Sequence, residues 1–255
     1  MAVERPPRLD LTRPRAYGEL LATSLQVFAA HVDVLLTLAI VLVAPVTLFV
    51  DGVWGGLLAD GLDAKPSLAS QITSALLSAC IVLPLVTGAS ALLVQGLGRG
   101  EAPRDVGSAL RAASSVFPRV LGAQLLYAAA VLVGFFLLVV PGIYLGVRCY
   151  FATQAAALDG LAPAAAMRRS GEVVQGSWWR TLGCLLMTAL LVGVTAEIAA
   201  TILGGTGSGA LYVAGRIVFQ AIAVAVSALF ATLLYYDLRV RSGRAPTASA
   251  DTMTP

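Results

Sequence analysis

Three fully charged side chains lie well inside long apolar stretches of the sequence: Arg148, Glu197 and Arg216. A charged group in the middle of a membrane helix costs roughly 2.5–3.5 kcal/mol on insertion scales, so such groups pair with one another or line a wet cavity. The same number of residues separates each of them from the nearest predicted turn, at Pro141, Gly204 and Gly209 respectively. At a rise of ~1.5 Å per residue, all three are therefore predicted about 10 Å below one face of the membrane.

The chemistry of this predicted layer depends on how its charges pair. Glu197 and Arg216 flank one short turn, which predicts an ion pair between the two helices. Arg148 then has no acidic neighbour at its depth, and Asp51 is the nearest candidate. One interpretation is a structural layer of salt bridges with an arginine whose charged end reaches the interface. The other is an outward-opening pocket whose spare positive charge binds the phosphate or carboxylate of a headgroup.

The elements that must position these charges follow from the composition of the chain. Apolar residues make up 58% of the 255 residues and charged residues 12%, and the mean hydropathy is +0.85. A soluble domain carries roughly a quarter charged residues, because its surface must face water. The composition therefore predicts an all-α integral membrane protein in which lipid covers most of the surface.

Six apolar stretches approach the roughly twenty residues that a helix needs to cross a bilayer. The predicted spans are 32–53, 68–97, 120–140, 143–158, 179–203 and 211–236. Only Pro141-Gly142 separates the third from the fourth, so these two form either a tight spanning hairpin or a re-entrant pair. We favour spanning because the third stretch is long enough to cross. The prediction is a six-span helical bundle over residues 14–238, with disordered tails at 1–13 and 239–255.

The positions of the basic residues predict the orientation of the bundle. Arginines recur in the N-terminal segment, in the connections after spans two and four, and in the C-terminal tail, whereas Lys65 is alone on the other side. Basic residues favour cytoplasmic loops, so both termini are predicted in the cytoplasm, with the protein in a bacterial-type inner (cell) membrane. Aromatic residues at the span ends are predicted interfacial anchors: Trp54, Trp178, Trp179, Tyr235 and Tyr236.

Amphipathic segments precede the odd-numbered spans, at Pro14–Phe28, Pro103–Phe117 and Pro163–Ser177. Each is predicted to be a helix lying at the cytoplasmic interface, where it could contact lipid or a protein partner. The first two have equal length, begin with Pro-Arg and end with Val-Phe. This similarity suggests three repeats of an interfacial helix plus a membrane hairpin, and chance similarity of two amphipathic segments is the alternative.

Residues for catalysis, metal binding or nucleic-acid binding are not recognisable in the sequence. His31 is the single histidine, and Cys80, Cys149 and Cys184 each stand alone in an apolar stretch, so no zinc set can form. No phosphate-binding loop or nucleophile elbow is present. Basic residues do not form a long stripe interleaved with aromatic residues, so nucleic acid is not an expected partner. We expect no catalytic site, no metal and no cofactor.

Residues 139–183, VVPGIYLGVRCYFATQAAALDGLAPAAAMRRSGEVVQGSWWRTLG, carry a family resemblance. They resemble the most characteristic segment of the glycerophosphoryl diester phosphodiesterase membrane-domain family. RPRAYGELLATSLQVFAAH near the start and LLYYDLRVR near the end are also similar to that family. The most specific parts are Pro141-Gly142-Ile143 with Arg148, and Arg168-Arg169-Ser170 followed by Gly176-Ser177-Trp178-Trp179. The family takes its name from proteins in which this module precedes a separate soluble phosphodiesterase domain, whose metal-binding residues this chain lacks. The resemblance therefore implies a stand-alone membrane module without that activity.

Three classes of function remain after these considerations. The sequence favours a non-enzymatic membrane protein that binds or organises lipids or partner proteins. The alternative is a transporter or lipid-translocating protein with an anion-binding pocket in the outer leaflet, which the charged layer and the proposed repeat would support. An intramembrane enzyme is the least favoured class, because no set of catalytic side chains lies deep in the spans.

Overall fold

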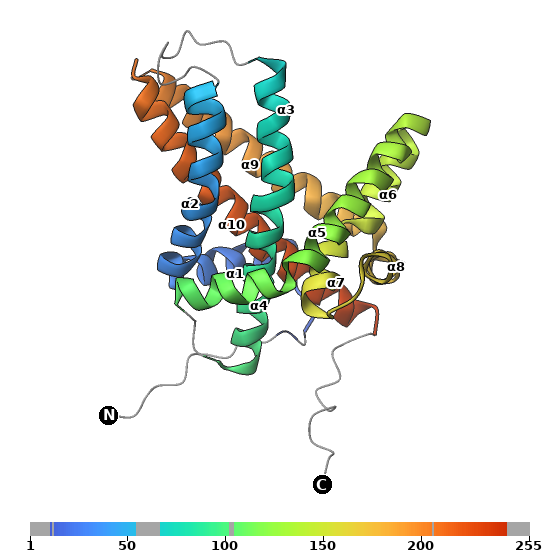
Figure 1. Ribbon diagram of the computed structural model, residues 1–255. Helices are drawn as coiled ribbons and strands as arrows, with labels where there is room; N and C mark the ends of the chain where they lie inside the picture. The colour runs from blue at the N-terminus through green and yellow to red at the C-terminus, as the bar shows by residue number, and fades with distance from the viewer. Residues whose placement is uncertain (1–10, 12, 55–66, 102–104, 206, 244–255) are drawn as a thin grey trace, which may run out of the picture.

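The computed structural model describes residues 11, 13–54, 67–101, 105–205 and 207–243, and their regular structure is helical (Figure 1). In chain order the elements are α1 (Tyr17–Ala30), α2 (Val32–Thr47), η1 (Leu48–Trp54), α3 (Leu68–Leu77), η3 (Ser78–Val82), α4 (Leu83–Arg99), α5 (Val106–Leu137), α6 (Val139–Cys149), α7 (Ala152–Leu158), α8 (Pro163–Val174), α9 (Trp178–Gly204) and α10 (Gly209–Arg241). The two η segments are π-helical: η1 continues α2, and η3 joins α3 to α4.

Five helical stretches within the described residues are long and apolar enough to cross a membrane. They are Val32–Val50, Leu68–Arg99, Val106–Leu137, Trp178–Gly204 and Gly209–Arg241. By length and composition, the chain is therefore an all-helical, multi-pass membrane protein. The predicted helix at 68–97 is one continuous stretch in spite of Pro84, because the π-helical η3 directly precedes it. There the N–H of Leu83 bonds to the carbonyl of Ser78, five residues back.

The predicted fourth span, 143–158, is not one helix, and this part of the prediction was wrong. α6 ends at Cys149 and α7 begins at Ala152. The hydroxyl of Ser170, on α8, accepts a hydrogen bond from the N–H of Phe151 at 3.1 Å and donates one to the carbonyl of Arg148 at 2.8 Å. A side chain inserted into the backbone ladder in this way is a recognised cause of a sharp break in a helix.

The first and last of the three predicted interfacial segments form short separate helices, α1 and α8. The middle segment, Pro103–Phe117, corresponds to the first part of α5. Asp105 caps the start of α5, since its carboxylate accepts a hydrogen bond from the N–H of Ser108. Hydrogen bonds from the side chain and the backbone of Ser108 lower the pKa of Asp105. In Figure 1 this first part crosses α4 in the lower half of the bundle, and the rest of α5 rises beyond Pro118, which lies inside the helix.

Both ends of the described chain meet at one end of the bundle. The guanidinium of Arg241 donates a hydrogen bond to the carbonyl of Arg15 at 3.0 Å. We call this the terminal end, and the opposite end, where α9 turns into α10, the turn end. α10 continues to Arg241, so the C-terminal tail predicted from residue 239 begins too early. Residues 244–255 and 1–10 of the predicted tails lie outside the described residues.

The core of the bundle is built around α10, which packs against α1, α2, α4 and α9. Its buried positions include Ala221, Ala225 and Leu229, none of which is exposed. Small side chains of this kind let neighbouring helices approach closely in a membrane, where packing replaces the hydrophobic effect as the source of association. α5 packs against α4, α6 and α7 on the other side of the bundle.

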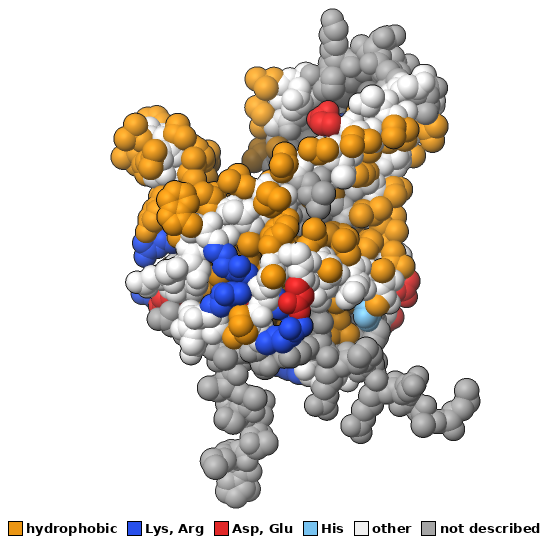
Figure 2. All heavy atoms as spheres, turned by 180° about the vertical axis from the view of Figure 1, so that it is seen from behind, with side chains coloured by type: hydrophobic (Ala, Val, Ile, Leu, Met, Phe, Trp, Pro, Cys, Tyr) orange, Lys and Arg blue, Asp and Glu red, His pale blue; other side chains and the backbone are white. Residues whose placement is uncertain are grey.

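The surface divides into an apolar and a charged part. In Figure 2 hydrophobic side chains cover the upper part of the visible face, and Lys and Arg side chains gather in the lower part, toward the terminal end. The tip of the α5–α6 hairpin stands away from the bundle, and Phe136 at this tip is 93% exposed. An apolar tip of this kind is stable in lipid and costly in water, which agrees with a membrane setting.

Candidate functional site

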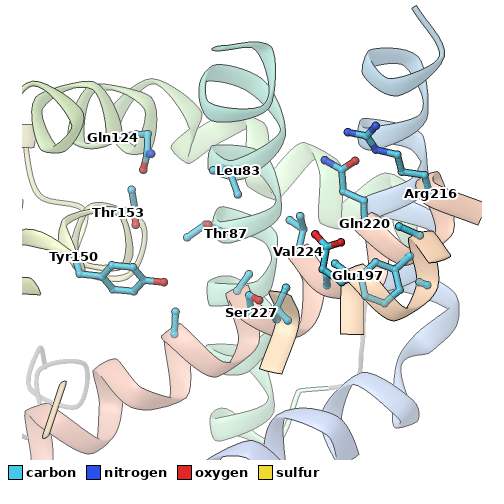
Figure 3. A pocket seen from close by; sticks show the side chains of 18 of the residues that line it. Leu83, Thr87, Gln124, Tyr150, Thr153, Glu197, Arg216, Gln220, Val224 and Ser227 are labelled. Atoms are coloured by element: carbon cyan, nitrogen blue, oxygen red, sulfur yellow. The ribbon is translucent and has the colours of Figure 1, made fainter. Parts of the chain in front are cut away.

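A cavity of about 750 Å³ lies among α4, α5, α7, α9 and α10, within the apolar part of the bundle (Figure 3). Its walls combine alanine, valine and leucine with an unusual number of polar side chains for a membrane interior. The polar lining comprises Thr87, Gln124, Tyr127, Tyr150, Thr153, Gln154, Glu197, Tyr212, Arg216, Gln220 and Ser227. Polar groups inside a membrane protein are costly in lipid, so a cavity that they line is a candidate functional site.

One face of α10 forms the longest wall of this cavity. Two neighbouring ridges of the helix face it, one of Tyr212, Arg216, Gln220, Val224 and Ala228 and one of Phe219, Ala223, Ser227 and Ala231. From Tyr212 to Ala231 the helix rises by about 28 Å at ~1.5 Å per residue. This is close to the thickness of the hydrocarbon core, roughly 30 Å. The cavity therefore follows α10, which runs obliquely to α4 in Figure 1, over a length comparable to the thickness of the hydrocarbon core.

The charged side chains of the cavity lie toward the turn end. Glu197 on α9 and Arg216 on α10 both line it, as the sequence predicted for two members of the charged layer. The predicted ion pair between them is absent from the ion pairs formed by the described residues, which include no Glu197–Arg216 contact within 4.0 Å. Gln220 lines the same stretch, and its side-chain oxygen accepts a long hydrogen bond of 3.5 Å from Thr47. In Figure 3 the charged ends of Glu197 and Arg216 lie on the same side of the cavity as Gln220.

The polar side chains toward the terminal end are neutral. Gln124 and Tyr127 come from α5, while Tyr150, Thr153 and Gln154 come from the break between α6 and α7 and from α7 itself. The hydroxyl of Thr153 donates to the side-chain oxygen of Gln154 at 2.9 Å, and both residues are buried. The rings of Tyr127 and Tyr150 meet edge to face, with centroids 6.4 Å apart. Amides and phenols can donate and accept hydrogen bonds without bringing a charge.

Arg148 does not line this cavity, so the structure does not bring the three predicted charges together in one site. Its guanidinium donates to the hydroxyl of Tyr144 at 2.9 Å and lies 5.8 Å from the centre of that ring. It also packs against α8, where a Cβ added to Gly171 would be 2.9 Å from Nε of Arg148. α6 packs against α8, and the Arg148 side chain lies in this contact and not on the cavity wall.

The predicted aromatic anchors divide into two groups. Trp54 and Trp179 are 51% and 79% exposed, as residues at a membrane interface would be, and Trp178 stacks on Tyr144 with centroids 6.1 Å apart. Tyr235 and Tyr236 are only 0% and 5% exposed, so the prediction that they are interfacial anchors was wrong. α10 is covered at this point by α1, α4, α7 and α8, and both rings are part of the core.

Two networks of charge at the terminal end, one around a buried and one around a partly buried carboxylate, were not found by the sequence reasoning. Asp237, 2% exposed, accepts hydrogen bonds from the N–H of Arg15 at 2.6 Å, from Arg180 at 3.1 Å and from Arg241 at 2.9 Å. Arg180 and Arg241 also donate to the carbonyl of Arg15. One carboxylate thus joins the segment before α1, the start of α9 and the end of α10.

The second network is centred on Asp159, in the turn between α7 and α8. Its carboxylate accepts hydrogen bonds from Tyr235 at 2.7 Å and from Arg239 at 2.8 Å, and Arg169 lies 3.7 Å away. The signal in the sequence was that Asp159 and Asp237 are acidic residues beside arginine-rich segments. The amides Gln124, Gln154 and Gln220 inside predicted spans were a second signal, because only full charges were counted there.

The polar side chains of the cavity are suited to binding a polar ligand. A carboxylate, a guanidinium, amides and hydroxyls can hold a phosphorylated or zwitterionic group by charge and hydrogen bonds. Among the residues that the structure describes, no group of three or more His, Cys, Asp or Glu is placed to hold a metal ion. The described lining of the cavity likewise contains no histidine or cysteine.

Comparisons with known proteins find no match. No family model matches the chain. No curated protein matches it, and neither does any solved structure. The resemblance to the glycerophosphoryl diester phosphodiesterase membrane-domain family therefore stays a prediction from the residues that carry it.

Proposed function

We propose that this protein is a non-enzymatic membrane protein that binds a phospholipid, with the headgroup inside the cavity and the acyl chains in the surrounding bilayer. The observation that carries the proposal is the presence of Arg216 and Glu197 on the walls of a cavity formed mainly by apolar, span-length helices. A guanidinium has five N–H donors in a fixed fork that matches a phosphate, so Arg216 can bind a ligand phosphate together with any protein partner.

The orientation in the membrane is part of the proposal. Five single crossings would place the two termini on opposite faces, whereas Arg15 and Arg241 touch each other. We infer that α5 enters the membrane and that α6 and α7 return, which makes six passes with a broken fourth helix. The arginine-rich terminal end then faces the cytoplasm. In this orientation α1, the first part of α5 and α8 would lie near the cytoplasmic interface, in agreement with three repeats of an interfacial helix plus a membrane hairpin.

Native mass spectrometry with added phosphatidylglycerol tests the binding proposal. We expect the wild-type protein to retain the lipid, and Arg216→Ala to bind it about tenfold or more weakly, because a hydrogen bond to a charged group contributes roughly 1.5–3 kcal/mol. Arg148→Ala is the matched control, since it removes the same side chain from a site outside the cavity. Circular dichroism and size-exclusion chromatography check that each variant folds. Equal occupancy of the wild type and a folded Arg216→Ala variant would contradict the proposal.

A further inference from the structure

The cavity is longer than a binding site for one headgroup needs to be. Its wall on α10 extends from Tyr212 to Ala231, about 28 Å at ~1.5 Å per residue. A phosphate bound at Arg216 would occupy only the part near the turn end. The remaining length reaches toward the terminal end along the same helix face, past Ser227.

Polar side chains accompany the cavity over this whole length. Arg216, Gln220 and Glu197 lie toward the turn end, and Gln124, Tyr150 and Thr153 lie toward the terminal end. Figure 3 places Thr87 and Ser227 between these two groups, on α4 and α10. A headgroup that moves along the cavity can therefore exchange one set of hydrogen-bond partners for the next. These protein partners replace the water molecules that the headgroup loses when it leaves the aqueous phase.

The wall formed by α9 is loosely held. Only 12% of the most apolar stretch of α9 is buried, compared with 56% of that of α10. α9 packs mainly against α10. Leu190, Val194 and Ile198 on α9 are 62%, 49% and 55% exposed. Acyl chains can lie against this apolar surface in the bilayer while the headgroup is inside, so a lipid does not have to leave the membrane in order to move.

We propose that the cavity is a path along which phospholipid headgroups cross the bilayer, so that the protein equilibrates lipid between the two leaflets. This inference rests on the proposed lipid binding. The movement follows the lipid gradient and forms or breaks no covalent bond. Arg216 and Glu197 bind the headgroup near the turn end, and the neutral amides and phenols bind it near the terminal end without holding it by charge.

Reconstitution into liposomes that contain fluorescent phosphatidylglycerol tests the path. Dithionite quenches only the outer leaflet of a sealed vesicle. We expect vesicles with the wild-type protein to lose the inner-leaflet signal as well, and protein-free vesicles to keep it. Ser227→Trp should block the middle of the cavity and preserve the inner-leaflet signal, while lipid still binds near Arg216 in native mass spectrometry. Val218→Trp is the matched control, because Val218 is 44% exposed on α10 and does not line the cavity.

The outcomes separate the path from the binding site. Wild-type protein that retains phosphatidylglycerol but leaves the inner leaflet unquenched would overturn the path and leave the binding proposal intact. Wild-type protein that neither binds nor moves the lipid would overturn both. If Ser227→Trp moves lipid as fast as Val218→Trp, the route lies elsewhere and the inference is wrong. Ser227→Leu, a smaller block at the same position, replaces Ser227→Trp in this comparison if the tryptophan prevents folding.

Discussion

The hydroxyl of Tyr235 donates a hydrogen bond of 2.7 Å to the carboxylate of Asp159, which lies 76 residues earlier in the chain. Arg239, one helical turn after Tyr235, donates to the other carboxylate oxygen at 2.8 Å. The last turns of α10 are therefore bound to the connection between α7 and α8. Since α7 and α10 both line the cavity, this contact holds two of its walls in a fixed relation.

Tyr235→Phe removes the hydroxyl and leaves the ring in the core. We expect the free energy of unfolding to fall by about 1.5–3 kcal/mol, because the lost hydrogen bond goes to a charged group. Tyr236→Phe is the control, since it is the same change on an equally buried neighbour that is outside the Asp159 network. Thermal unfolding in detergent, followed by tryptophan fluorescence, measures the difference. Equal melting temperatures for the two variants would contradict the structural role of the Tyr235 hydroxyl.

Asp237→Asn should be more destabilising, because it leaves Arg180 and Arg241 beside a neutral amide. Removal of one partner of a buried ion pair costs roughly 3–5 kcal/mol, and we expect about 3 kcal/mol since both arginines are about one third exposed. Asp33→Asn, at an exposed position at the start of α2, is the control. Chemical denaturation in mixed micelles would show the difference, and a loss no larger than that of Asp33→Asn would refute it.

Ser170→Ala removes both hydrogen bonds that occupy the break between α6 and α7. The buried N–H of Phe151 would lose its partner at a cost of about 1–3 kcal/mol, and the partly buried carbonyl of Arg148 would lose one at a smaller cost. We expect faster hydrogen–deuterium exchange at Phe151 and a lower melting temperature. Ser114→Ala, at an exposed position of α5, should change neither. Unchanged exchange at Phe151 would mean that the break does not depend on α8.

Gly134→Ala should disturb the α5–α6 hairpin. A Cβ at this position would lie 2.8 Å from the Cα of Gly142 and 3.1 Å from its nitrogen, so the backbones must separate. Overpacking of this kind costs roughly 1–3 kcal/mol. Gly193→Ala is the control, because a Cβ there meets no atom within 4 Å. A melting temperature of Gly134→Ala as high as that of Gly193→Ala would show that the hairpin can relax without loss.

Much of the architecture follows from the sequence because the bilayer imposes a simple requirement. An apolar stretch must be about twenty residues long to cross it, and a backbone in hydrocarbon must bond to itself, so length and hydropathy predict helices and their approximate ends. The depth of Glu197 and Arg216 follows in the same way, since both are counted from one short turn. These two residues do line one cavity.

Other features were decided by contacts between distant segments. Ser170 of another helix forms the hydrogen bonds at the break at Tyr150–Phe151, and Arg148 lies outside the cavity that Glu197 and Arg216 line. The burial of Tyr235 and the grouping of Gln124 with Gln154 likewise depend on which helices pack together. Membrane helices are alike in apolar character, so hydropathy does not specify their neighbours. Close packing and hydrogen bonds between helices make that choice, and they exist only in the folded bundle.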